Sequence, residues 1–469
     1  MNKYMSVNRI RKLCSAVLST VMLMILCGCG RGEVPVSGGM RLAGSLNVDS
    51  EVSYTDDSPV QVAEGTFSSA EELCTIVKYP YYYDVTLDYT KGTPAEVGEA
   101  YALTILQAVP DYEENLEPYL FENIRSAFSG RDINMKALET RILTLESSIP
   151  GEYREEIESF ARAISCGEEG YLENGKLSYI EALTMQLIPD ALRPTACSAL
   201  SVSGDLTASG ERITMRNLEW SLGSSAQMTG IHSVTHMNRN GGSITSIAML
   251  GLLDMITAVN SYGVMIGILD VGSVNAMPFV YEDKKCYTFE IRYALDHFET
   301  AKDAAEFLNA ESGDFTWCNN LIVTDRTDAF CCENATREVQ DAGRAVSVIR
   351  TPQSELMEGL KWDTPEVLCV VNSFATKGNQ DGFTGEPGNI NRFVKYNRWV
   401  NDITLFTVAE MKGIMAHEVV DQYEVVNVHN SGTVHTVIVD YATGDIHVAF
   451  TIGGCADDIP EYVLVGNYM

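Results

Sequence analysis

Basic residues are scarce in this sequence. The chain has 33 Lys and Arg residues against 64 Asp and Glu residues, which gives a net charge of −31 over 469 residues. A surface this acidic repels phosphate backbones, so the composition argues against nucleic-acid binding. Histidine is also rare, with seven residues. His232 and His236 are spaced i, i+4, but on a predicted strand and without the glutamate of a metalloprotease motif, so we expect neither a metal site nor a cofactor.

A disulfide framework is equally missing, although the chain has 12 cysteines. Their spacings do not repeat, and the adjacent Cys331 and Cys332 are poorly placed to pair with each other. The chain also lacks internal repeats, low-complexity tracts and any long apolar run beyond its N-terminus. With 469 residues it can still bury a sizeable core.

The N-terminus has the pattern of a bacterial export signal. Basic residues up to Lys12 precede an apolar stretch from Ala16 to Leu26, and Leu26-Cys27-Gly28-Cys29 follows. The pattern resembles a lipoprotein signal, in which cleavage before Cys29 frees this cysteine to carry lipid. We therefore expect a signal peptide over 1–28, an anchor and tether over 29–78, and a protein held by lipid on the extracytoplasmic face of a bacterial membrane. A plain secretory signal or a cytosolic protein is the alternative.

The rest of the chain divides into two parts of different character. Residues 79–196 contain mainly helical patterns after a short aromatic β-segment at 79–87. Residues 197–469 alternate short strands with glycine turns. They include a hairpin signal at Asn240-Gly241-Gly242, helical stretches at 288–308 and 391–417, and a closing hairpin at 434–451. The pattern alone predicts an α+β, antiparallel fold.

The stretch from Cys197 to Trp220 carries the strongest functional signal. It predicts a strand, a glycine-rich turn and a returning strand that brings Arg216 and Glu219 back beside Cys197. A thiol becomes a good nucleophile when a base or a cation lies close to it. Arg216 and Glu219 are three residues apart, so a regular strand would place them on opposite faces. A bulge or a strand end is required if both are to point at Cys197.

These residues resemble the start of the mature chain in N-terminal-nucleophile (Ntn) hydrolases. Cys197-Ser198 and Arg216-Asn217-Leu218-Glu219 are similar to the Cys-(Ser/Thr) start and the Arg-Asn-x-Asp element of the choloylglycine hydrolase, penicillin V acylase and acyl-coenzyme A:6-aminopenicillanic acid acyltransferase families. Glu219 departs from the aspartate of those families. The resemblance implies a catalytic region over 197–469, folded as a four-layer αββα sandwich and preceded by a helical pro-segment over 79–196. It also implies autoproteolysis between Ala196 and Cys197, after which the new α-amine of Cys197 acts as the general base.

Three later segments resemble further elements of the same families. Residues 260–264 resemble an Asn-Glu-x-Gly-Leu turn, residues 371–374 a Thr-Asn-His-Phe element, and residues 391–395 a Ser-Arg-Phe-Val-Arg helix start. Arg216 would then stabilise the sulfur, Glu219 would hold the α-ammonium, and Asn372 would bind the tetrahedral intermediate or the α-amine. Arg392 would complete the polar shell. Asn260 and Asp270 are the candidates for the substrate and oxyanion positions, with a backbone N–H of the same strand as the alternative to Asp270.

The sequence thus predicts a cysteine amidohydrolase that cleaves a linear, non-peptide C–N amide in a small acylated amine. An acyltransferase that passes the acyl-cysteine to an amine is one alternative. A binding lipoprotein that kept the fold and lost catalysis is the other, suggested by the departures at Glu219, Asp270 and Ser373. The oligomeric state stays open.

Overall fold

The computed structural model describes residues 46–47, 53–128, 133–165, 167–192, 196–272, 274, 279–358, 360, 364–379, 387–416, 418–419, 428–430, 432–453 and 459–469. The export signal, Cys29 and most of the expected tether lie outside the described residues. Among the described residues, no helix combines the length and the apolar character needed to cross a membrane.

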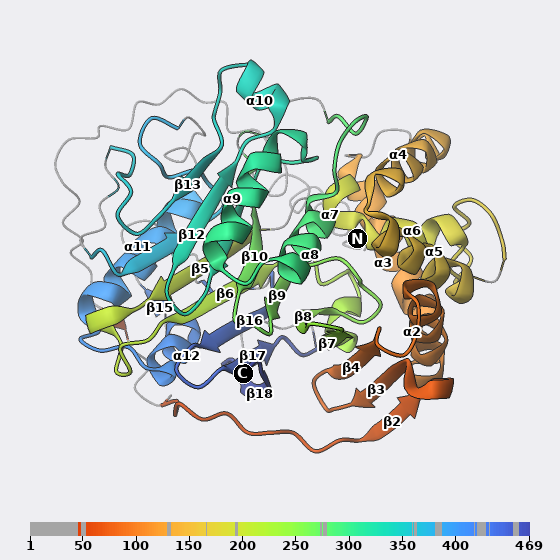
Figure 1. The fold of residues 1–469 in the computed structure, drawn as a ribbon, viewed down its shortest axis with the longest axis horizontal. Coiled ribbons are helices and arrows are strands. Elements are labelled where there is room, and N and C mark those ends of the chain that lie inside the picture. Colours follow the sequence, from red (N-terminus) through yellow and green to blue (C-terminus); the bar gives the residue numbers. More distant parts are fainter. Residues whose placement is uncertain are drawn as a thin grey trace, which may run out of the picture. The chain divides into compact units, whose positions relative to one another are not determined.

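Two large β-sheets form the centre of the fold (Figure 1). The first has ten strands in the order β13 (Val348–Arg350), β12 (Ala329–Asn334), β11 (Asn319–Thr324), β10 (Met265–Asp270), β9 (Thr257–Asn260), β8 (Gly242–Met249), β7 (His232–Arg239), β4 (Tyr83–Asp88), β3 (Cys74–Lys78) and β2 (Gly65–Ser68). The second has six, in the order β14 (Val367–Val370), β5 (Ala196–Val202), β6 (Ile213–Glu219), β16 (Thr433–Asp440), β17 (Asp445–Phe450) and β18 (Tyr462–Asn467). A separate two-stranded pair joins β1 (Leu46–Asn47) to β15 (Glu418–Val419).

Helices cover the outer face of each sheet. On the ten-stranded sheet, α8 (Tyr287–His297) contacts β8 and β9, and α9 (Ala301–Glu311) contacts β11 and β12. On the six-stranded sheet, α11 (Pro387–Asp402) contacts β14 and α12 (Val408–Ala416) contacts β16. The sheets meet through their inner faces, where β10 contacts β5. The predicted α+β fold, with two facing sheets between layers of helices, is confirmed.

The segment before Cys197 is mainly helical, as expected. Its helices are α2 (Pro94–Ala108), α3 (Tyr112–Ala127), α4 (Met135–Ser148), α5 (Gly151–Ile164), α6 (Tyr179–Gln186) and α7 (Ile188–Ala191). Two of them begin at capping boxes, because Thr93 and Ser178 each accept a backbone N–H while a glutamate three residues later bonds back. The short helix α10 (Arg337–Asp341) follows β12. Single 3-10 turns occupy Ala70–Glu72, Gly204–Leu206, Gln227–Gly230 and Ser312–Asp314.

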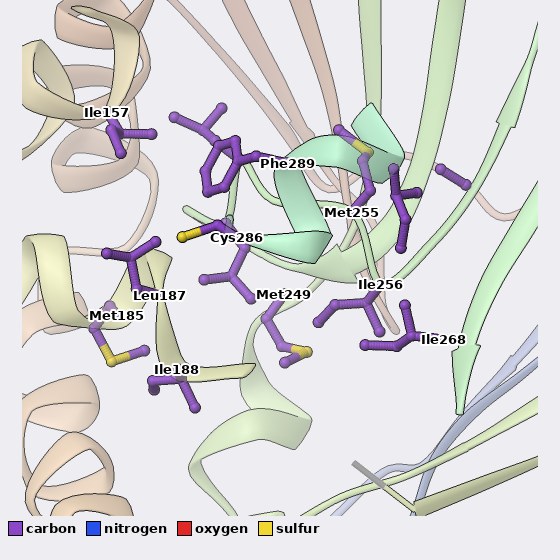
Figure 2. Close-up of a cluster of buried hydrophobic side chains, with 14 of the residues drawn as sticks. Ile157, Met185, Leu187, Ile188, Met249, Met255, Ile256, Ile268, Cys286 and Phe289 are labelled. Atoms are coloured by element: carbon purple, nitrogen blue, oxygen red, sulfur yellow. The ribbon is translucent and has the colours of Figure 1, made fainter. Parts of the chain in front are cut away.

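The leader (the described residues of 53–192) shares a sheet and a core with the body (the described residues from 196 on). Strand β4 pairs in parallel with β7, so β2, β3 and β4 extend the sheet of the body. Part of the stretch expected as a tether, 65–78, therefore forms strands. Figure 2 shows leader side chains packed against body side chains in one apolar cluster, among them Leu187, Met249 and Phe289. Both parts belong to one compact unit, Leu42–Met469.

Candidate active site

Cys197 lies on β5 with its thiol buried between the two sheets and in contact with Arg216. The Nη2 atom of Arg216 donates to the sulfur at 2.9 Å. In the β5–β6 register, Ala199 is opposite Arg216 and Cys197 is opposite Leu218, so both side chains project from the same face of the sheet. Both residues are fully buried. The local strand–turn–strand sequence is therefore sufficient to bring a guanidinium to the thiol.

The other partners of Arg216 come from the facing sheet and are neutral. Its Nη1 donates to the Thr257 hydroxyl at 2.8 Å, and its Nη2 also donates to the Ile268 carbonyl at 2.7 Å. Burial lowers the pKa of Arg216, and the neighbouring Cys197 thiol acts in the opposite direction. A guanidinium keeps its charge in proteins, and of these three partners only the sulfur can become an anion. The arrangement stabilises a thiolate at Cys197.

The main chain of Cys197 is held from the opposite side by two residues that are distant in sequence. Its N–H donates to Oδ1 of Asn372 at 2.8 Å, and its carbonyl accepts from Nη1 of Arg392 at 2.7 Å. Arg392 also donates to Oδ1 of Asn372 through Nη2 at 2.8 Å. Asn372 follows β14 and Arg392 lies on α11. Two residues selected from the sequence thus converge on the nitrogen and oxygen of the candidate nucleophile.

Glu219 takes a different position from the one expected for it. The β5–β6 pairing runs without a register shift to Ala196 opposite Glu219, so Glu219 projects from the face opposite to Arg216. Its Oε1 accepts from Nη1 of Arg392 and from Nδ2 of Asn217, both at 3.3 Å. The Cys197 N–H donates to Oδ1 of Asn372, the other residue that the sequence places at the α-amine. Glu219 reaches Cys197 through Arg392, which bonds both.

The two candidates for the oxyanion position differ in where the structure places them. Asp270 ends β10, and its main-chain carbonyl accepts from Nδ2 of Asn372 at 2.7 Å, so its backbone belongs to the site. Asn260 does not join this group. Its Oδ1 accepts from the N–H groups of Tyr262 and Val264, and its Nδ2 donates to the carbonyls of Leu295 and Phe298. These four bonds use the full capacity of a carboxamide, and they join the β9–β10 turn to the end of α8.

Sequence reasoning missed one residue behind Arg392. Asn389 lies one turn earlier on α11, and its Oδ1 accepts from Nη2 of Arg392 at 2.5 Å. Its Nδ2 donates to the Ser373 hydroxyl at 2.7 Å, which gives this departure from the family's histidine a defined partner. The sequence predicts this helix only from residue 391, so the i, i+3 spacing of Asn389 and Arg392 becomes a signal only once α11 is seen to start at Pro387.

The remaining described cysteines are buried thiols in other surroundings. Cys74, Cys286, Cys318, Cys331, Cys332 and Cys369 are all free. Burial raises the pKa of Cys318 to about 11 and that of Cys331 to about 12. Among the described residues, no group of three or more His, Cys, Asp or Glu side chains is arranged to hold a metal ion. His232 and His236 bond different partners, the Thr451 carbonyl for the first and Thr245 for the second.

Two buried carboxyl groups lie where the leader joins the body. On α7, Asp190 accepts from the N–H of Tyr287 at 2.7 Å and from the hydroxyl of Thr288 at 2.6 Å, at the start of α8. Asp254 is fully buried between β8 and β9, and in the described structure neither of its carboxyl oxygens has a hydrogen-bond partner. Burial raises the pKa of Asp190 to about 7. Burial and then the charge of Asp190 raise the pKa of Asp254 well above its usual range.

Asp254→Asn is expected to stabilise the protein more at pH 8 than at pH 5. A carboxyl whose pKa is raised by folding binds its proton more tightly in the native state, so stability is lost as pH rises from its unfolded pKa of about 4 toward its raised native pKa. Thermal unfolding followed at both pH values checks this, and equal changes in melting temperature would contradict it. Asp190→Asn is the comparison variant and should destabilise at pH 5, where the carboxyl is mostly protonated, because it weakens the acceptors that hold α8.

Comparison with known proteins returned neither a matching family model nor a matching curated sequence. The chain is similar to several solved structures. One is the Caenorhabditis elegans ortholog of N-acylethanolamine-hydrolyzing acid amidase, with 13% identity and a TM-score of 0.35 over 52% of this chain and 92% of that chain. Another is a variant of the conjugated bile acid hydrolase from Clostridium perfringens, with 12% identity and a TM-score of 0.33 over 58% and 96%.

A third is the penicillin V acylase from Agrobacterium tumefaciens, with 12% identity and a TM-score of 0.32 over 54% of this chain and 83% of that chain. At these identities and TM-scores the likeness says nothing about the chemistry of this chain, which rests on its own residues.

Proposed function

We propose that this protein is a cysteine Ntn hydrolase that cleaves a linear, non-peptide amide of the N-acyl amine or N-acyl amino acid kind. The observation that carries the proposal is the double contact at Cys197. Its sulfur accepts from Arg216 at 2.9 Å while its nitrogen donates to Asn372 at 2.8 Å. A thiol and its own main-chain nitrogen, each held by a separate polar partner, are the two groups that an N-terminal cysteine nucleophile uses.

The proposed reaction begins with cleavage of the Ala196–Cys197 bond. The thiol attacks the carbonyl carbon of Ala196, the acyl group moves from nitrogen to sulfur, and water hydrolyses the thioester to leave a free α-amine on Cys197. An unperturbed α-amine has a pKa of about 8, so at neutral pH it can exchange a proton with the adjacent thiol. This explains how the chemistry proceeds without a catalytic histidine. Residues 193–195, just before the bond, lie outside the described residues.

In turnover, the thiolate attacks the substrate's amide carbon and the α-amine holds the proton taken from sulfur. Collapse of the tetrahedral intermediate breaks the C–N bond, and this proton leaves with the amine product. Water then attacks the acyl-cysteine, giving one proton to the α-amine, and the carboxylic acid leaves as the thiol is restored. Arg216 stabilises the charge on sulfur. Asn372 orients the α-amine, and Arg392 holds the carbonyl of Cys197 while Glu219 balances its charge.

The leader is proposed to stay bound after cleavage. It supplies β2, β3 and β4 to the ten-stranded sheet, and Glu156 on α5 forms a fully buried ion pair with Arg292 on α8 at 2.7 Å. Separation would expose the sheet edge and the apolar core that the two parts share, which is unfavourable in water. The proposed mature protein is thus two associated chains. We further propose that lipid on Cys29 anchors the first of them to the membrane.

The test is a substrate panel combined with intact-mass measurement. The purified protein should release amine from at least one of bile-acid conjugates, penicillin V or N-acyl amino acids, and the fragment that begins at Cys197 should gain the mass of the acyl group. Acyl-coenzyme A with a free amine acceptor, added to the same assay, distinguishes acyl transfer from hydrolysis. A chain that stays in one piece and acquires no acyl group would contradict the proposal and favour a binding protein.

A further inference from the structure

Asn372 lies on an irregular segment, so its position depends on neighbouring elements. Strand β14 ends at Val370, and residues 371–375 continue outside any strand or helix. Side chains can hydrogen-bond the backbone of such a segment where no strand pairs with it. The contact between Asn372 and Cys197 therefore depends on the side chains that hold this segment in place.

Asn320 contacts the segment on both sides of Asn372. It lies on β11 and is fully buried. Its Nδ2 donates to the carbonyl of Val371 at 2.8 Å and to the carbonyl of Ser373 at 2.9 Å. Both N–H groups of one carboxamide are therefore used on the two peptide carbonyls that flank Asn372. Such a bridge restricts both the position and the rotation of the peptide units on either side of Asn372.

Glu333, the cross-strand neighbour of Asn320, holds the next part of the segment. The β11–β12 register pairs Asn320 with Glu333. Oε1 of the fully buried Glu333 accepts from the N–H groups of Ala375 at 2.8 Å and Thr376 at 3.1 Å. Arg350 donates to the same oxygen at 3.1 Å, which compensates the buried charge. The β11–β12 pair thus holds the segment in two ways. Asn320 binds two of its carbonyls, and Glu333 binds two of its N–H groups.

The strand next to β11 also sets the orientation of the Asn372 side chain. In the β10–β11 register, Asn320 lies opposite Leu269, and the following residue, Asp270, accepts from Nδ2 of Asn372. Because Nδ2 of Asn372 is directed at this carbonyl, its Oδ1 is left to accept from the N–H of Cys197. The Asp270 carbonyl on β10 thus orients the side chain of Asn372, and Asn320 on β11 holds the backbone around Asn372.

We infer that Asn320 is a positioning residue for the proposed reaction, and that it acts by holding the Asn372 carboxamide at the nitrogen of Cys197. The effects on catalysis that this inference predicts rest on the proposed function. A purely structural role, in which Asn320 only satisfies two buried carbonyls, makes a different prediction. It would change stability without changing the titration of the α-amine.

Asn320→Ala is expected to reduce kcat by at least about 10-fold, because small misplacements of positioning groups have effects of this size or larger. It is also expected to move the acidic limb of the kcat/KM pH profile to lower pH. An oxygen that accepts from the α-amine favours the ammonium form, so displacing it lowers the pKa of the amine. Asn372→Ala should cause the same shift. The double variant should show little further change, because both substitutions remove one interaction.

Asn319→Ala is the matched control. Asn319 is the adjacent residue on β11 and is as well buried, but its amide donates to Trp317 and accepts from Asn334. The control should lower the melting temperature without moving the acidic limb. Asn320→Asp keeps the shape of the side chain and removes both donors, so it serves if the alanine variant does not fold. An unmoved limb in a folded Asn320 variant, or additive effects with Asn372→Ala, would overturn the inference.

A failure of the proposed function is recognised separately, in the wild-type protein. If the wild-type chain stays in one piece and turns over no amide, the function is wrong whatever the variants do. The positioning role is then tested by hydrogen exchange of the Cys197 N–H, which in the uncleaved chain donates to Asn372. Faster exchange in Asn320→Ala, with exchange unchanged in Asn319→Ala, supports the positioning role. Equal exchange in the two variants contradicts it.

Discussion

Cys197→Ala is expected to leave a single uncleaved chain with no amidase activity. In the proposed mechanism the same sulfur breaks the Ala196–Cys197 bond and then forms the acyl intermediate. Removing it therefore abolishes both steps at once. N-terminal sequencing and intact mass should show two chains for the wild-type protein, with the second beginning at Cys197, and one chain for the variant.

The control for this experiment is another buried thiol. Cys318 is fully buried, and burial raises the pKa of its thiol to about 11. Cys318→Ala should be cleaved and active, with at most a lower melting temperature from the lost packing. A Cys197→Ala chain that is still cut before residue 197 would show that another nucleophile performs the cleavage. If the wild-type protein is active without a new N-terminus at Cys197, the α-amine of Cys197 is not the general base.

Arg216→Met is expected to lower the rate of acyl transfer on the order of 100-fold, the usual loss when a charge-stabilising donor is removed. The guanidinium is fully buried and bonds the sulfur, so its removal takes a positive charge from a region of low dielectric. The pKa of the Cys197 thiol should rise, and the pH dependence of alkylation by iodoacetamide measures it. Arg216→Lys should restore part of the rate, because an ammonium supplies the charge without the planar fork.

Arg212 provides a matched control on the same strand–turn–strand unit. It is also buried and donates to the carbonyl of Asp325, the hydroxyl of Ser201 and the carbonyl of Thr327, all away from the thiol. Arg212→Met should lower the melting temperature and leave the thiol pKa unchanged. If Arg216→Met behaves like Arg212→Met, with near-normal turnover and reduced stability, Arg216 is a structural residue.

The sequence by itself determined the local units of this protein. The period-2 pattern and glycine turn of the 197–220 stretch predict the hairpin. Within a hairpin, the alternation of side chains already decides that Arg216 shares a face with the residue opposite it. Helical periodicity located α8, α9, α11 and α12 to within a few residues. The strands β2 and β18 were missed. Strand β2 has only four residues at a sheet edge, too few for alternation to distinguish it from a loop.

Only the tertiary structure decided which distant residues meet at Cys197. The three-residue spacing of Arg216 and Glu219 predicts opposite faces, but it does not indicate that Arg392 occupies the second face and receives Glu219. Similarly, no local pattern separates Asn372, which contacts Cys197, from Asn260, which closes a turn elsewhere. The physical reason is that backbone geometry sets the direction of a side chain within its own element. What stands opposite that side chain depends on how sheets and helices from the whole chain pack together.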